Sequence, residues 1–157
     1  MLGELNEHDM EALLRAEAVG RLGCYGDGEV YVVPVTYVYE GGSVYGHTHE
    51  GMKVRFMRKH PHVCFEVDRT RDLANWESVI AWGIFEPLQG EAAAQAMSLL
   101  ASRLIPRMVG APTLPTHAVN VLTRRRTDAH GHKGLVYRIV LDTMTGRFER
   151  NAMERTG

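Results

Sequence analysis

A chain of 157 residues with a formal net charge of −1 is long enough for one domain with its own core, and its charge is too small to favour nucleic acid or an anionic membrane. No apolar run approaches the roughly 20 residues of a membrane-spanning helix, so neither a membrane nor a nucleic acid is expected as a partner. The two cysteines, Cys24 and Cys64, form no CxxC motif, and the start MLGELNEHDM lacks a secretory signal pattern. We therefore expect a single domain over residues 1–157, a cytoplasmic location and two buried, structural thiols.

The first part of the chain is predicted to form one helix followed by hairpins. Residues 6–19 have apolar positions at helical spacing, with Asn6 available as a cap and Gly20 as the stop. The sequences GDG at 26–28 and EGG at 40–42 are typical of hairpin turns. We therefore expect short strands on both sides of each turn.

The run VYVVPVTYVY, residues 30–39, is rich in β-branched and aromatic residues and predicts a strand. Pro34 within it has no N–H to donate to a sheet, so the strand is expected to be interrupted or to lie at a sheet edge there. Further strands are predicted at 43–47, 62–67, 78–87 and 135–142, with Gly83 as a bulge or a point of close approach.

Two further helices are predicted. Residues 52–60 form a short one that ends before Pro61, and the Ala- and Leu-rich stretch 91–104 forms a longer one. The Pro-rich stretch 105–116 is expected to be irregular. Several short, closely connected strands with few helices predict a mainly β fold, namely a small antiparallel barrel with flanking helices.

The turn HTHEGMK, residues 47–53, links a predicted strand to a predicted helix. It brings a hydroxyl, backbone N–H groups and Lys53 together at a helix N-terminus. Such a place favours a phosphate, because the first N–H groups of a helix are unpaired and its dipole is positive there. The alternative is a solvated basic turn without a ligand.

The histidines are candidate metal ligands. The spacing His47-x-His49 could present two imidazoles to a metal, with His60, His62 and Cys64 nearby in sequence. Strand alternation, however, places His62, Cys64 and Glu66 on one face, so no clean ligand set emerges and no metal site is predicted. A separate pair, His130 and His132, is expected in a surface loop.

The sequence contains no GxSxG motif, no Walker loop and no GxGxxG motif. Taken together, the segments GRLGCYGDGEVYVVPVTYVYEGGSVYGHTHEGMKVRFMRKHPHVCFEVD and WESVIAWGIFEPL resemble the FMN-binding split β-barrel family around pyridoxamine 5′-phosphate oxidase. The similarity runs from about residue 7 to residue 148 and is greatest to the nitroimidazole-resistance-like flavoprotein branch. It implies a split β-barrel of antiparallel Greek-key type, and a homodimer with two FMN sites at the subunit interface.

The resemblance also implies a set of cofactor-binding residues. Lys53 and Thr48 match the phosphate-binding turn, which further includes His47, His49, Gly51 and Met52. The strand that follows the isoalloxazine ring is matched by Val33, Pro34, Val35 and Thr36. Trp76 and Ser78, in the WESV segment, correspond to the contribution of the second subunit, although simple dimer packing is the alternative for Trp76. His47 matches a histidine linked to the active site of the branch, and the alternative is a histidine that only shapes the turn.

The function implied is that of an FMN-dependent oxidoreductase acting on a small molecule, such as a nitro-aromatic or quinone-like acceptor, with a nicotinamide cofactor as a possible electron donor. Vitamin B6 oxidation is not expected, because the additional arginines and the C-terminal substrate site of the oxidase proper have no match here. The alternatives are a flavin carrier or sensor without a substrate, and a split barrel that binds haem or a deazaflavin. Residues 105–133 have no assigned role.

Overall fold

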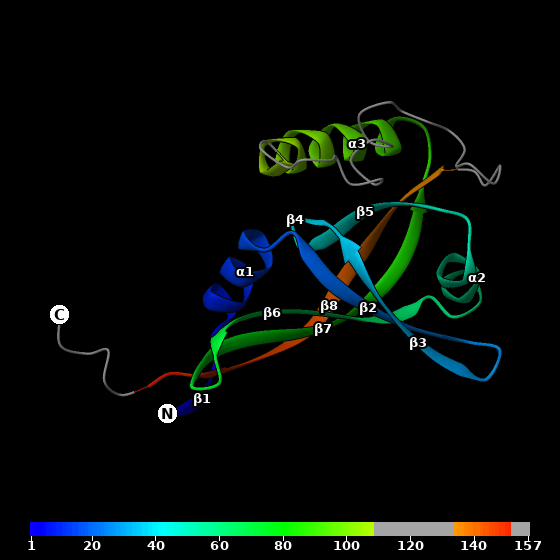
Figure 1. Cartoon of the computed structure of the whole chain (residues 1–157). Helices are drawn as coiled ribbons and strands as arrows, with labels where there is room; N and C mark the ends of the chain where they lie inside the picture. The colour runs from blue at the N-terminus through cyan, green and yellow to red at the C-terminus, as the bar shows by residue number, and fades with distance from the viewer. Residues whose placement is uncertain (109–133, 152–157) are drawn as a thin grey trace.

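The computed structural model describes residues 1–108 and 134–151, and its main element is one antiparallel sheet (Figure 1). The strands are β1 (Leu2–Glu4), β2 (Val19–Gly26), β3 (Glu29–Thr36), β4 (Val38–Glu40), β5 (Ser43–His49), β6 (His62–Asp72), β7 (Asn75–Leu88) and β8 (Gly134–Glu149). Neighbouring strands follow the order β3-β2-β6-β7-β8-β5-β4, with β1 added beside β8. The mainly β, split-barrel fold with flanking helices is therefore confirmed.

Gly83 marks an irregularity in the pairing of β7 with β8. The register between β7 and β8 shifts between Trp82 and Gly83, as in a β-bulge. A Cβ atom added to Gly83 would lie 2.4 Å from the carbonyl oxygen of Val140 and 2.9 Å from a methyl carbon of Ile139. The predicted close approach is therefore confirmed, since only glycine lets the two strands approach to this distance.

In the described part of the chain the sheet is flanked by the helices α1 (Glu7–Ala16), α2 (Met52–Lys59) and α3 (Gly90–Leu104), the last followed by the 3-10 turn η1 (Ile105–Met108). Figure 1 shows α2 at the opposite end of the sheet from the β6–β7 hairpin, with α3 beside β4 and β5. The predicted cap of α1 is confirmed, because the Asn6 side chain accepts a hydrogen bond of 2.9 Å from the N–H of Asp9.

The main core lies between the inner face of the sheet, α1 and α2. Its fully buried side chains include Leu14 of α1, Phe56 of α2, and Phe65, Tyr137 and Ile139 of the strands. A second, smaller cluster joins α3 to β4 through Val38, Leu100 and Leu104. Burial of these apolar side chains provides most of the driving force for this arrangement.

Several predicted boundaries were wrong. Helix α1 ends at Ala16, and Gly20 lies inside β2 instead of stopping the helix. A Cβ atom on Gly20 would lie 2.3 Å from the Phe65 ring, which explains the glycine by packing. The strands β6 and β7 extend beyond the predicted 62–67 and 78–87, β8 continues through the polar stretch to Glu149, and β1 was not predicted.

The predicted strand at 30–39 is divided between β3 and β4, and the division falls at Tyr37. Pro34 lies within β3, which is the edge strand of the order given above, so its expected edge position is confirmed. Both predicted turns are hairpin turns, and their left-handed residues are Asp27, Gly28, Gly41 and Gly42. Of the stretch 105–116, only η1 belongs to the described residues; His130 and His132 lie outside them.

Candidate flavin-binding turn and a separate arginine-lined pocket

Strand β5 fixes the first half of the turn at 47–53. Its residues His47 and Thr48 pair with Val136 and Leu135 of β8. One position earlier, Gly46 lies opposite Tyr137, and a Cβ atom there would approach the tyrosine hydroxyl oxygen to 2.4 Å. The buried Tyr137 ring therefore requires glycine at this point, and it sets the path along which β5 enters the turn.

Helix α2 begins directly after the turn, with Gly51 as its N-cap residue. Within the described part of the chain, no side chain forms a capping hydrogen bond here, and the first helical turn contains no acidic residue. The first N–H groups of a helix have no intrahelical partner. The N-terminus of α2 therefore presents uncapped donors and the positive end of the helix dipole.

Lys53 lies in this first turn and is half-buried. Burial lowers the pKa of its ammonium group below the ordinary value, an effect partly offset by the nearby Cys24. Among the described residues it has no hydrogen bond or ion pair. By contrast, the other cations of α2 are paired: Arg55 and Lys59 with Asp27, and Arg58 with Glu50.

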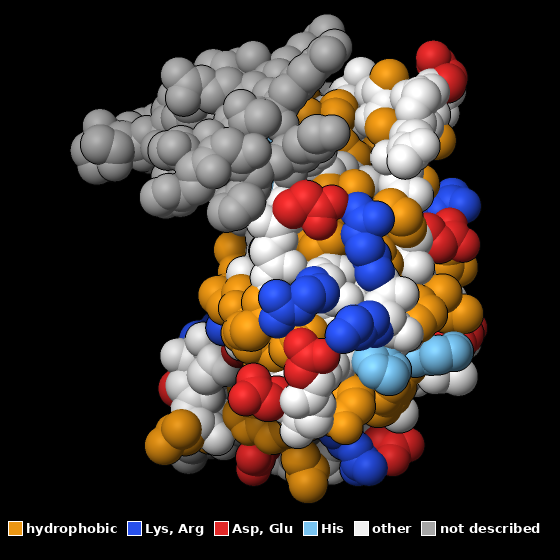
Figure 2. Space-filling view, turned by 90° about the vertical axis from the view of Figure 1, so that its right-hand side faces the viewer, with side chains coloured by type: hydrophobic (Ala, Val, Ile, Leu, Met, Phe, Trp, Pro, Cys, Tyr) orange, Lys and Arg blue, Asp and Glu red, His pale blue; other side chains and the backbone are white. Residues whose placement is uncertain are grey.

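The side of the molecule that carries α2 faces the viewer in Figure 2. There, Lys and Arg side chains are interleaved with Asp and Glu side chains, and histidine side chains lie beside them. This surface is balanced in charge, in agreement with the ion pairs of α2. Among the described residues, Lys53 is thus the cation of α2 that has no ion-pair partner.

The two histidines of the turn lie in edge-to-face contact. The ring centroids of His47 and His49 are 5.5 Å apart with an interplanar angle of 80°, and His47 is 7% exposed. The Nε2 atom of His49 is buried and has no hydrogen-bond partner in the described part of the chain. Such an atom costs about 1–3 kcal/mol when it is left unsatisfied, so a bound polar ligand would recover this energy.

The strand predicted to follow the flavin ring is the edge strand β3. Val33 and Val35 pack against the main core, whereas Pro34 is exposed and Thr36 is partly buried. Because β3 pairs with β2 on one side only, the backbone groups of its other edge are available to a ligand. The role of residues 33–36 beside a flavin ring stays a prediction.

Trp76 and Ser78 are not brought near the turn within one chain. Trp76 pairs with Thr70 near the far end of β6, whereas His62 at the other end of β6 follows α2 directly. At a rise of about 3.3 Å per residue, Thr70 is roughly 26 Å from His62. One chain therefore holds the two predicted halves of the flavin site at opposite ends of the β6–β7 pair.

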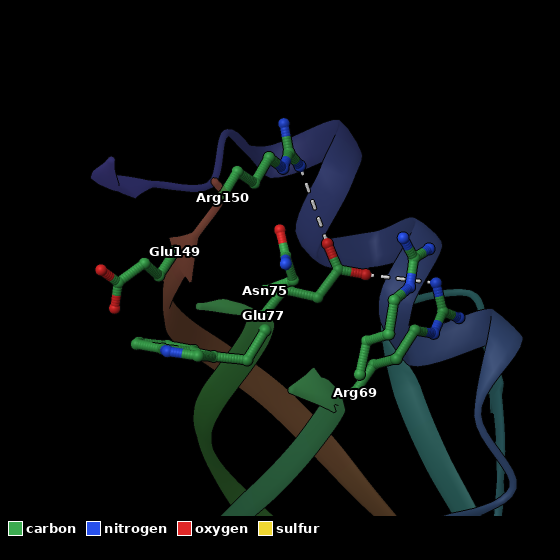
Figure 3. A pocket seen from close by; sticks show the side chains of 7 residues that line it. Arg69, Asn75, Glu77, Glu149 and Arg150 are labelled. Carbon is green, nitrogen blue, oxygen red and sulfur yellow. Dashed lines mark hydrogen bonds and ion pairs between the residues drawn. The ribbon is translucent and has the colours of Figure 1, made fainter. Parts of the chain in front are cut away.

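A separate pocket of about 160 Å³ lies beside Trp76 (Figure 3). Besides this indole it is lined by Arg69, Arg71, Asn75, Glu77, Glu149 and Arg150. None of its charged residues was predicted from the sequence. The alternation of Arg69 and Arg71 beyond the predicted strand 62–67 was a usable signal, because alternate residues of a strand share a face.

The thiols differ in burial. Cys24 is buried as expected, but Cys64 is only partly buried, which corrects that expectation. It lies on the outward face of β6 with His62 and Glu66, as the alternation predicted.

In the described residues no group of three or more His, Cys, Asp and Glu side chains is arranged to hold a metal ion. None of the helices in this part of the chain has the length and the hydrophobicity that a membrane span requires.

Solved structures resemble this chain over most of its length. An FAD-binding protein from Mesorhizobium loti is 26% identical with a TM-score of 0.70, and the alignment covers 94% of this chain and 98% of that one. A candidate 5-nitroimidazole antibiotic resistance protein from Bacteroides thetaiotaomicron is 19% identical with a TM-score of 0.62, covering 94% and 87%. The latter shows likeness of fold alone.

Among curated sequences, the uncharacterized protein RA0666 of Rhizobium meliloti (strain 1021) is 27% identical over 84 residues, which is 54% of this chain and 56% of that protein. The matched segment thus spans little more than half of that relative. The model of the family described as pyridoxamine 5′-phosphate oxidase matches residues 6–148, which include the β5–α2 turn, the edge strand β3 and most of β8. The chain belongs to the pyridoxamine 5′-phosphate oxidase family.

Proposed function

We propose that this chain binds FMN non-covalently at the β5–α2 turn and is a flavin-dependent oxidoreductase for a small organic acceptor, such as a nitro-aromatic or quinone-like molecule. The observation that carries the proposal is Lys53, a half-buried cation at an uncapped helix N-terminus that has no ion-pair partner among the described residues. A relative of similar fold is named an FAD-binding protein, which supports a flavin as the ligand. The bound flavin would supply the redox chemistry.

The chain's own residues would then bind and orient the cofactor. Lys53 and the first N–H groups of α2 hold the phosphate, with the Thr48 hydroxyl and the backbone of Gly51 and Met52 around it. The Thr48 hydroxyl can donate a hydrogen bond to the phosphate, because its bond to the carbonyl oxygen of His49 is long, at 3.4 Å. The unsatisfied Nε2 atom of His49 gains a polar partner from the cofactor.

His47 is the residue that we propose for the reaction itself. His47 is buried near the end of β5, where its ring contacts the ring of His49. It is six residues before Lys53 in the sequence. A histidine changes its charge near neutral pH, so it can hydrogen-bond or transfer a proton to a substrate beside the flavin. If it only shaped the turn, its replacement would affect folding and not turnover.

A second copy of the chain is proposed to complete each flavin site. The outward face of the sheet exposes a row of apolar side chains, here called the outer patch, which consists of Ile80, Trp82 and Ile84 of β7 and Val140 of β8. Each of them is at least 37% exposed. In register with Trp82, the neutral residues Cys64, Gly23 and Val32 continue the same face across β6, β2 and β3.

The position of the outer patch favours a two-fold dimer. Its β7 residues begin at Ile80, on the side of Trp76 and the hairpin end, and finish at Ile84, which pairs with His62 next to α2. We propose an isologous interface whose two-fold axis lies in the interface and crosses β7 at the patch. An axis in this direction places the hairpin end of one copy against the α2 end of the other. Trp76 and Ser78 would thereby reach the partner's flavin, although they are remote from Lys53 in their own chain.

The test of FMN binding is an absorbance spectrum of the purified protein, recorded after FMN has been added and unbound cofactor removed by gel filtration. We expect a flavin spectrum with near one FMN per chain in a dimer-sized peak. Lys53→Met should weaken FMN binding by about 1.5–3 kcal/mol, because a charge-assisted contact is lost. Lys59→Met is the matched control, since that exposed lysine is engaged with Asp27 at 2.9 Å.

Equal affinities of the two lysine variants would remove Lys53 from the phosphate site. A protein that takes up no FMN would contradict the proposal and favour a haem- or deazaflavin-binding barrel. A protein that takes up FMN but oxidises no nicotinamide cofactor with any added acceptor would be a flavin carrier or sensor.

A further inference from the structure

The pocket beside Trp76 combines an aromatic wall with a surplus of arginine. Its lining includes three arginines and two glutamates, and Arg69 is also paired with Glu17, which lies outside the lining. Figure 3 shows Glu77 between Arg69 and Arg150, with ion-pair distances of 3.2 and 3.7 Å. Of these two arginines, Arg150 is held less closely, because its contact with Glu77 is the longer one and its side chain is 59% exposed.

The walls of the pocket are held in place from several elements. Arg69 is fixed by Glu17 of the segment after α1 at 2.7 Å, in addition to Glu77. The side-chain oxygen of Asn75 accepts a hydrogen bond of 3.0 Å from the N–H of Asn151, which ties the hairpin to the end of β8. The pocket is therefore preorganised, and its binding groups need little further ordering when a ligand enters.

We propose that this pocket binds the adenosine diphosphate part of a dinucleotide. An indole face offers stacking to an aromatic base, and guanidinium groups offer charge-assisted hydrogen bonds to phosphate. The volume of about 160 Å³ is below the roughly 300–1,000 Å³ of pockets that enclose a whole drug-sized ligand, so it accepts one ring system with the rest outside. A dinucleotide has this shape, with a base at one end and its reactive ring at the other.

The identity of the dinucleotide rests on the proposed function. In the dimer proposed above, the hairpin end of one copy lies against the α2 end of its partner. The reactive ring of a dinucleotide anchored beside Trp76 then reaches the partner's flavin site. Two kinds of dinucleotide contain adenosine diphosphate. One is FAD, bound as the cofactor itself, and the other is a nicotinamide dinucleotide that delivers electrons to the flavin.

The test is a titration with ADP followed by tryptophan fluorescence. The chain contains two tryptophans, so Trp82→Phe leaves Trp76 as the only reporter. We expect ADP to quench its emission in a saturable manner and adenosine, which lacks phosphate, to bind much more weakly. Calorimetric titration of the unmodified protein with ADP provides a second measurement that does not depend on the fluorescent variant.

Two arginines of the same segment form a matched pair. Arg150→Gln should weaken ADP binding about tenfold, because a charged contact to phosphate is lost. Arg147→Gln is the control, since Arg147 is 60% exposed, pairs with Glu4 at 3.4 Å and does not line the pocket. Absence of ADP binding by both methods would overturn the proposal, as would equal affinity for adenosine or equal losses in the two variants.

Competition then separates the two kinds of dinucleotide. If ADP displaces bound FAD but not FMN, the pocket holds the tail of the cofactor; if ADP instead raises the KM for the nicotinamide cofactor, it holds the tail of the donor. ADP that competes with neither would overturn the assignment to a dinucleotide. FMN uptake is measured separately in the absence of ADP, so failure of the proposed function and failure of this pocket give different results.

Discussion

The ammonium group of Lys53 and the thiol of Cys24 influence each other between α2 and β2. Burial raises the pKa of the Cys24 thiol, and the Lys53 charge lowers it again in part. Burial likewise lowers the pKa of Lys53, and Cys24 offsets some of that change. A neutral thiol gives a cation little compensation, whereas a phosphate carries nearly two negative charges at neutral pH. The structure thus leaves Lys53 with a desolvation cost that an anionic ligand can offset.

The affinity for FMN should therefore depend on pH through Lys53. Its pKa lies below the ordinary 10.5 in the ligand-free protein, and phosphate binds the charged form. We expect FMN affinity to fall as pH rises through this lowered pKa. Riboflavin, which has the same ring but no phosphate, corrects for titration of the ring, so the FMN-to-riboflavin affinity ratio is the quantity to measure. The Lys53→Met protein should show a flat ratio; a flat ratio in the unmodified protein would refute the role of Lys53.

Turnover should depend on His47 separately from cofactor binding. We expect His47→Gln to retain FMN while the rate of acceptor reduction falls by about 10²–10⁴-fold, the usual contribution of a proton-transferring side chain. The measurement is steady-state turnover of the FMN-loaded variant over a range of pH. Loss of the pH-dependent limb together with the rate identifies proton transfer. A variant with full FMN content and full turnover would exclude a catalytic role.

Gly46→Ala should destabilise the fold by about 1–3 kcal/mol, because the added methyl group meets the buried Tyr137 ring. Gly23→Ala is the matched control on another strand, since its Cβ atom would lie 3.6 Å from the Cβ of Cys64, an ordinary contact. Urea denaturation of both variants gives the difference in free energy of unfolding. Equal stabilities would mean that the Tyr137 ring moves aside at little cost.

The outer patch should control association. Trp82 and Ile84 are 42% and 38% exposed. The double variant Trp82→Lys, Ile84→Lys would place two charges in the proposed interface and should yield monomers that bind FMN poorly. Leu2→Lys, at a residue that is 62% exposed outside the patch, should remain dimeric. Light scattering after gel filtration measures the mass of each species. A double variant that keeps the mass of the unmodified protein would place the interface elsewhere.

Local chemistry determined how much of the fold could be predicted. The cap by Asn6 and the left-handed turn at Asp27 and Gly28 act within a few residues, so the sequence displays them directly. The outer half of β6 was missed because Arg69 and Thr70 are exposed on both faces and show no apolar alternation. Gly20 was misinterpreted as a helix stop because its close contact with Phe65 is visible only in three dimensions.

The same reasoning applies to the sites. The turn around Lys53 is contiguous in sequence, and its geometry agrees with the prediction of uncapped N–H groups beside a cation. The arginine-lined pocket joins residues of the β6–β7 hairpin to Glu149 and Arg150, and only the pairing of β7 with β8 brings them together. Its prediction would have required the register of those strands, which extend further than their apolar patterns indicate.

The distance between Lys53 and Trp76 along one chain has a genetic consequence. In the dimer that we propose, each flavin site takes its lysine from one copy and its tryptophan from the other. A chain altered only at Lys53 and a chain altered only at Trp76 would therefore complement each other when they are produced together. Of the two sites in such a mixed pair, one would carry both defects and the other neither, so two inactive parents would give a half-active hybrid.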